Sequence, residues 1–104
     1  MALGGWGEEM LKSLRVGRAG MGAAGVMEDG VFNANLHMVE LERRMIEAAD
    51  EVIMVVDHSK FGRRSLVRLC EFKEIDELVT DSAVDPRWMT ILRSHGVRVH
   101  LADV

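Results

Sequence analysis

Cysteine and proline each occur once in this chain of 104 residues, and tyrosine does not occur at all. Because Cys70 is the single thiol, no disulfide can form within the chain, and a lone thiol is typical of the reducing interior of a cell. No apolar run approaches the roughly 20 residues that a membrane-spanning helix needs. The start of the sequence also lacks the features of a signal peptide. We therefore expect a cytoplasmic protein with no membrane contact.

Positive charge is also scarce, since 13 lysine and arginine residues are outnumbered by 17 acidic ones and the net charge is −4. A DNA-binding domain usually has a basic face and a recognisable reading helix, and this sequence has neither pattern. Its one basic cluster, within residues 60–68, is typical of a solvated turn. We expect no direct DNA contact by this chain.

Residues that hold metals and nucleotide cofactors are few or badly spaced. The four histidines are scattered, and with a single cysteine they form no metal-binding pattern. Residues 20–25 match the G-x-G-x-x-G of dinucleotide-binding loops, but a predicted helix occupies the place of the acidic residue that should follow. His58 and Ser59 are adjacent, yet no nearby third group completes a nucleophilic triad. We expect no metal and no cofactor.

Hydrophobic residues make up 48% of the chain, and their spacing predicts helices and strands. A helix is expected over residues 36–49, capped by Asn33 or Asn35. Its apolar stripe consists of Met38, Leu41, Met45 and Ala49, flanked by Val39 and Ile46. A second helix should begin at Asp85-Pro86 and end at Gly96.

Residues 52–56 form a continuous apolar run, which is typical of a strand buried on both faces in a parallel sheet. Further strands are predicted at residues 66–69, 78–79 and 97–101, and a short strand within residues 16–26 is expected to run into a glycine loop. The resulting order is strand, helix, strand, strand, strand, helix, strand. This order predicts a three-layer α/β domain with a mainly parallel sheet flanked by helices.

Three polar loops directly follow predicted strands, at residues 22–25, 57–60 and 80–82. Because the carboxyl ends of parallel strands meet at one edge of a sheet, these loops should lie together. Close-approach glycines, hydroxyls, carboxylates and Lys60 would suit a small phosphorylated polyol. Lys60 and free backbone N–H groups would hold the phosphate, and the carboxylates would hold hydroxyls.

Glu42 lies inside the apolar arc of the predicted helix. A carboxylate in that position must find a partner or lie at a cleft. Helical geometry alone leaves two interpretations open. Glu42 is either a group that faces a ligand cleft or a flanking residue that reaches solvent or pairs with a base.

Residues 57–62 read Asp-His-Ser-Lys-Phe-Gly after an apolar strand, and residues 80–81 read Thr-Asp. In this order the two motifs resemble the signatures of the effector-sensing domains of DeoR-family transcriptional repressors. The likeness covers about residues 8–104. It implies an isomerase/CoA-transferase-type fold and a sensor, not an enzyme, which binds a small phosphorylated sugar or related metabolite and controls an attached helix-turn-helix.

The resemblance implies effector-binding roles for particular residues in the three loops, which are Asp57, Ser59, Lys60, Gly22, Gly25 and Asp81. Glu42 joins these candidates because it falls about where the catalytic glutamate of ribose-5-phosphate isomerase, which has a similar fold, would stand. We expect residues 1–17 to form a Gly-rich start with a short helix and residues 18–104 to form a partial sensor domain.

Two parts of the family pattern have no counterpart in this sequence, namely the winged helix-turn-helix and the first strands of the sensor domain. A sheet without its first strands would expose an edge that can pair with another chain. We therefore expect a homo-oligomer.

A ribose-5-phosphate-isomerase-like enzyme is the alternative to a sensor. The Asp-x-Ser-Lys element of that enzyme resembles residues 57–60. Its Asp-rich loop and its Lys-Gly-Gly-Gly stretch are not matched, so proton abstraction from a sugar phosphate would lack essential partners. A module that only mediates protein interactions is a third possibility.

Overall fold

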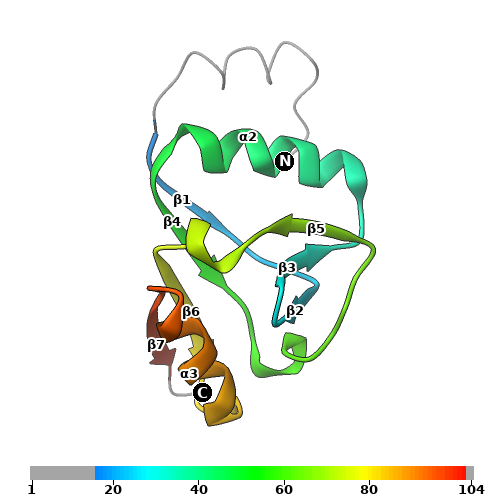
Figure 1. The fold of residues 1–104 in the computed structure, drawn as a ribbon. Coiled ribbons are helices and arrows are strands. Elements are labelled where there is room, and N and C mark those ends of the chain that lie inside the picture. Colours follow the sequence, from blue (N-terminus) through cyan, green and yellow to red (C-terminus); the bar gives the residue numbers. More distant parts are fainter. Residues whose placement is uncertain (1–15, 103–104) are drawn as a thin grey trace.

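A computed structural model of the chain describes residues 16–102 (Figure 1). The elements, in chain order, are β1 (Val16–Met21), β2 (Gly25–Met27), β3 (Gly30–Asn33), α2 (Leu36–Ala48), β4 (Ala49–Val55), β5 (Val67–Cys70), β6 (Glu77–Asp81), α3 (Pro86–Ser94) and β7 (Arg98–Ala102). Two 3-10 turns, His58–Lys60 and Phe72–Glu74, precede β5 and β6. The predicted α/β class is confirmed. The short helix predicted within residues 1–17 falls almost wholly outside the described residues.

The main sheet is parallel throughout and has the strand order β1-β4-β6-β7. Its register places Met21 beside Met54, and Met54 beside Leu78. Each crossover moves to the next strand in the same direction. Because such crossovers are right-handed, they carry the intervening chain over the same face of the sheet. That face therefore holds both described helices, α2 and α3.

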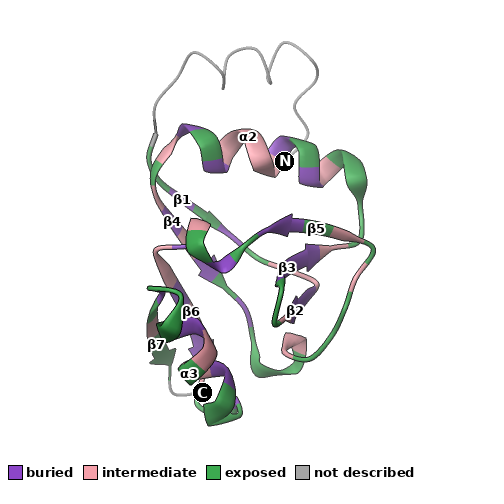
Figure 2. Cartoon of the chain, in the orientation of Figure 1, coloured by how far each residue is buried: buried purple, intermediate pink, exposed green. Residues whose placement is uncertain are grey.

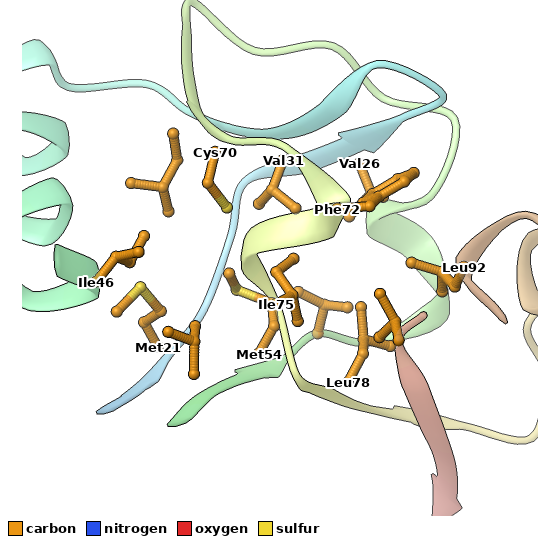
Figure 3. Close-up of a cluster of buried hydrophobic side chains, with 14 of the residues drawn as sticks. Met21, Val26, Val31, Ile46, Met54, Cys70, Phe72, Ile75, Leu78 and Leu92 are labelled. Carbon is orange, nitrogen blue, oxygen red and sulfur yellow. The ribbon is translucent and has the colours of Figure 1, made fainter. Parts of the chain in front are cut away.

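A second, smaller sheet is antiparallel, with the order β2-β3-β5, and packs into the same core. Val26 and Val31 of this sheet, like Met54 and Leu78 of the main sheet, are fully buried. Figure 2 shows the buried positions along the inner sides of the elements. Figure 3 shows the side chains from both sheets meeting in one cluster, which α2 joins through Ile46 and α3 joins through Leu92.

The hairpin formed by β2 and β3 is absent from the sequence prediction, which placed one short strand and a glycine loop within residues 16–26 and a turn at residues 28–30. The chain instead turns after Met21 and starts a new strand at Gly25. Gly30 closes the hairpin with a φ of 139°, and a Cβ there would lie 2.3 Å from the carbonyl oxygen of Cys70. The third predicted strand, residues 66–69, is found at Val67–Cys70, where it joins the antiparallel sheet.

The helix boundaries follow the predicted capping signals. Asn35 caps α2 by accepting a hydrogen bond from the backbone N–H of Met38, at 3.1 Å. Asp85 caps α3 by accepting from the N–H of Arg87, at 2.9 Å, and Pro86 occupies the first turn. Neither α2 nor α3 is long and apolar enough to cross a membrane.

Candidate functional site

The polar loops after β1, β4 and β6 lie at the same edge of the parallel sheet, as the sequence predicts (Figure 1). Gly22, just past β1, is close to β4, since a Cβ at this glycine would lie 3.5 Å from the carbonyl oxygen of Val55. The loop after β4 is joined to the end of β6 by a hydrogen bond from the N–H of His58 to Asp81. The three loops therefore form one polar rim.

Asp57 organises the turn that follows β4. Its Oδ1 accepts a hydrogen bond from the backbone N–H of Ser59, at 2.9 Å, and another from the hydroxyl of Ser59. These hydrogen bonds, chiefly the one from the hydroxyl, lower the pKa of Asp57 below its ordinary value. Asp57 is therefore an ionised carboxylate that fixes the shape of the turn.

The backbone N–H groups of this turn are already engaged. Their acceptors are Asp81 for His58, Asp57 for both Ser59 and Lys60, His58 for Phe61, and Val26 for Gly62. The sequence interpretation assumed that free N–H groups would hold a phosphate, and residues 58–62 do not supply them. The ammonium of Lys60 is the side-chain group here best suited to hold an anion, since the hydroxyl of Ser59 already donates its proton to Asp57.

Lys60 lies partly buried at the rim, with 32% of its side chain exposed. Its Nζ is 3.8 Å from Oδ2 of Asp57, which is a long ion pair within one turn. Such a pair at the surface contributes little free energy, so it leaves most of the hydrogen-bonding capacity of the ammonium for another acceptor.

Asp81 is the most buried carboxylate of the rim, with 14% of its side chain exposed. Its Oδ2 lies 3.1 Å from the backbone nitrogen of His58 and 3.0 Å from Nδ1 of the same residue. Its Oδ1 accepts from the N–H of Ala83, at 3.0 Å. Two hydrogen bonds from His58 lower the pKa of Asp81, and the one from the side chain has the larger effect. Asp81 thus fastens the loop after β4 to the end of β6.

Sequence reasoning did not include His58 among the site residues. Its partner Asp81 is 23 positions away, so no local pattern could reveal the contact. The available signal was the presence of a titratable ring inside the Asp-x-Ser-Lys motif, at the rim where the ligand was expected.

Gly25, in contrast to Gly22, is buried, and it allows two backbone segments to pack closely. A Cβ at this position would lie 2.2 Å from the carbonyl oxygen of Arg63. The backbone after the 57–60 turn therefore packs directly on β2, where Val26 and Phe61 form an isolated bridge. Gly25 supports the rim from behind.

Glu42 has an amide partner. The Nδ2 of Asn33 donates to Oε1 of Glu42, at 3.0 Å, and the Oδ1 of Asn33 accepts from the N–H of Ala24, at 2.8 Å. Burial raises the pKa of Glu42, and the hydrogen bond from Asn33 opposes this rise in part. Glu42 is thus connected to the glycine loop through Asn33. Among residues 16–102, no hydrogen bond or ion pair joins it to the 57–60 turn.

The basic residues after the turn lie apart from Lys60. Arg64 is 3.4 Å from a carboxylate oxygen of Asp29 and lies over the ring of Phe32 at 5.1 Å. Arg63 is exposed. The observed contacts support the interpretation of a solvated turn.

An open hollow of about 390 Å³ lies away from the rim, between α2 and β5, and its lining includes Arg43, Arg68 and Glu74. Within the described part of the chain, no group of acidic, histidine or cysteine side chains could hold a metal ion.

Comparison with known proteins gives a consistent result. The family model for the DeoR C terminal sensor domain matches residues 1–82. The chain is 32% identical over 94 residues to the HTH-type transcriptional regulator IolR of Bacillus subtilis (strain 168), which covers 89% of this chain and 38% of the relative. It is 35% identical over 95 residues to the HTH-type transcriptional repressor GlcR of the same organism, covering 91% of this chain and 37% of the relative.

A third relative is the glycerol-3-phosphate regulon repressor of Escherichia coli (strain K12). The identity is 33% over 82 residues, which covers 78% of this chain and 32% of the relative. The chain therefore spans only 32–38% of the length of these regulators.

Proposed function

The chain belongs to the DeoR C-terminal sensor domain family, and from this premise we propose that it senses a small phosphorylated sugar or related metabolite at the rim formed by the loops after β1, β4 and β6. Its relatives are transcriptional regulators, so this chain is a regulatory domain and not an enzyme. One relative is named for glycerol 3-phosphate, which is a phosphorylated polyol.

The arrangement around Lys60 carries the proposal. Its ammonium lies just past the carboxyl end of β4, where open α/β sheets bind ligands. Its carboxylate neighbour, Asp57, is 3.8 Å away and is itself occupied by Ser59. A ligand phosphate would give the ammonium a closer charged acceptor. The carboxylate of Asp57 and the hydroxyl of Ser59 would then face the hydroxyl groups of the ligand.

An isomerase is the less favoured function, because Glu42 is separate from the 57–60 turn. In the alternative reading, Glu42 would abstract a proton from a sugar phosphate bound near Lys60. Its observed partner is instead the amide of Asn33. We propose that the chain has no aldose–ketose isomerase activity. Turnover of ribose 5-phosphate above the buffer background, lost on Glu42→Gln, would contradict this.

We further propose that the domain self-associates in the cytoplasm and makes no direct contact with DNA or membranes. On the face of the main sheet away from α2 and α3, Val55 is 56% exposed and Ile53 is half-buried. Parallel sheets are almost always covered on both faces. A second copy would cover this face. Light scattering should give a mass above that of one chain, and Val55→Lys should lower it. A monomer at high concentration would count against self-association.

The effector proposal is tested by ligand-dependent thermal unfolding. Glycerol 3-phosphate, ribose 5-phosphate and fructose 6-phosphate are added to the chain, with glycerol, ribose and fructose as controls. A ligand that binds only the folded state raises the melting temperature. We expect at least one phosphorylated compound to do so and its unphosphorylated partner to have no effect. If no compound in a wider panel of phosphorylated sugars shifts the transition, the proposed function is wrong.

A further inference from the structure

The ring of His58 is held in place at one nitrogen and open at the other. Its Nδ1 lies 3.0 Å from Oδ2 of Asp81. Within residues 16–102, its Nε2 has no hydrogen-bonding partner, and 52% of the side chain is exposed. The ring therefore presents Nε2 to the surroundings of the rim from a fixed position.

The chemistry of Asp81 decides which nitrogen of the ring carries the proton. An ionised carboxylate can only accept hydrogen bonds, and the hydrogen bonds at Asp81 favour the ionised form. The Nδ1 of His58 must therefore be the donor. In the neutral ring, Nε2 then carries a lone pair and accepts a hydrogen bond.

The loops after β4 and β6 are joined even without the imidazole ring of His58. The backbone N–H of His58 already donates to the same Oδ2 of Asp81, at 3.1 Å. Asp81 also accepts from Ala83, so it remains engaged without the imidazole. The contact between the ring and Asp81 also orients the ring, because it fixes the rotamer and the tautomer of His58. Fixing a polar group before a ligand arrives lowers the entropy cost of binding.

We propose that His58 is a specificity-determining residue of the effector site, whose Nε2 accepts a hydrogen bond from a hydroxyl of the ligand. Asp81 is the positioning residue that holds the ring. This inference rests on the proposed function, in which the phosphate of the same ligand lies at Lys60. The two roles follow from the chemistry of the groups, since an ammonium is suited to phosphate and the lone pair of an imidazole nitrogen is suited to a hydroxyl.

Two substitutions separate the two nitrogens of the ring. The amide nitrogen of asparagine lies about where Nδ1 lies in histidine, so His58→Asn keeps a donor for Asp81 and removes Nε2. His58→Gln places its amide near Nε2 and abandons the contact with Asp81. The control is His100→Asn, because His100, on β7, is likewise 55% exposed and pairs through its Nε2 with a carboxylate, that of Glu77 on β6.

The experiment measures the dissociation constants of glycerol 3-phosphate and inorganic phosphate for each variant by calorimetry, together with its melting temperature. We expect His58→Asn to keep the melting temperature of the parent and to bind glycerol 3-phosphate about three- to tenfold more weakly, as for the loss of one neutral hydrogen bond. Inorganic phosphate has no carbon chain that carries an alcohol hydroxyl from Lys60 to His58, so it should bind the variant as it binds the parent. His100→Asn should leave both constants unchanged.

The outcomes distinguish this inference from the proposed function. If glycerol 3-phosphate binds the parent and His58→Asn equally well, His58 is only part of the loop contact and the inference is wrong. If His58→Asn weakens inorganic phosphate as much as glycerol 3-phosphate, the ring contacts phosphate and the hydroxyl assignment is wrong. If the parent binds neither these two compounds nor the other phosphorylated sugars, the proposed function and this inference both fail.

Discussion

Asp81 accepts from both the backbone and the ring of His58 through a single carboxylate oxygen, with distances of 3.1 and 3.0 Å. The two residues are 23 positions apart and stand at the ends of neighbouring parallel strands, β4 and β6. Their contact turns two separate loops into one rigid rim. The shape of the proposed ligand site therefore depends on a carboxylate that need not touch the ligand.

Asp81→Asn should lower the stability of the domain and change how it depends on pH. The folded-state pKa of Asp81 lies below its ordinary value of 3.8. The stabilisation it provides is fully present above that value and is lost as the pH falls toward the lower folded-state pKa. Melting temperatures measured between pH 6 and pH 3 should converge for the parent and the variant. Parallel curves over this range would contradict the linkage.

Gly25 and Gly22 should respond differently to alanine. A Cβ on Gly25 would lie 2.2 Å from the carbonyl oxygen of Arg63, whereas one on Gly22 would lie 3.5 Å from the carbonyl oxygen of Val55. The first distance forces backbone to move, and overpacking of this kind costs about 1–3 kcal/mol. The second is an ordinary contact. Urea unfolding should show a large loss for Gly25→Ala and a small one for Gly22→Ala, and equal losses would count against the packing described for β2.

The sequence predicted the fold class and most of its elements, because strong periodicity and capping signals mark them. Asn35 and Asp85 cap the helices as predicted, and β4 includes residues 52–55 of the predicted apolar run. The hairpin of β2 and β3 was missed because its strands have only three and four residues, too few for a period to show. The effector roles of the candidate residues stay predictions. Neither strand order nor the contact of Asp81 with His58 has a local signature, since both arise from pairing between distant segments.

Cys70 should be chemically inert while the protein is folded. Its side chain lies in the core cluster, and the residue is only 2% exposed. Burial raises the pKa of its thiol to about 12, so almost no thiolate is present at pH 8. Labelling with a disulfide reagent at pH 8 should be slow for the native protein and fast in denaturing urea. Rapid stoichiometric labelling of the native protein would mean that β5 is not packed as described.

Glu42→Gln should leave the domain as stable as the parent at pH 7, or more stable. Burial raises the pKa of Glu42 from its ordinary value of 4.5, which means that its ionised form is disfavoured in the folded state. The destabilisation therefore appears as the pH rises past that value and is absent at lower pH. Glutamine keeps an Oε1 acceptor for Asn33 and removes the charge. Thermal unfolding at pH 4 and pH 7 measures this, with Glu42→Ala as the control that loses the acceptor. A clear loss of stability for Glu42→Gln at pH 7 would mean that the charge has a partner.

The last prediction concerns Lys60, on which the proposed function chiefly depends. Lys60→Ala should remove most of the rise in melting temperature that a phosphorylated sugar produces. One charged hydrogen bond contributes about 1.5–3 kcal/mol, so affinity should fall roughly ten- to hundredfold. Lys60→Arg should also bind more weakly, because a planar guanidinium does not replace a compact ammonium.

Arg63→Ala is the matched control for Lys60→Ala, since this exposed residue lies just beyond the same turn and should bind like the parent. The ion pair of Lys60 with Asp57 is long and near the surface, so its loss alone should change stability by less than about 1 kcal/mol. A loss of ligand affinity in Lys60→Ala, without a matching loss of stability in the unliganded protein, would therefore assign the ammonium to the ligand and not to the fold. If Lys60→Ala binds phosphorylated sugars as tightly as the parent, the effector lies elsewhere, even though the chain remains a DeoR sensor domain.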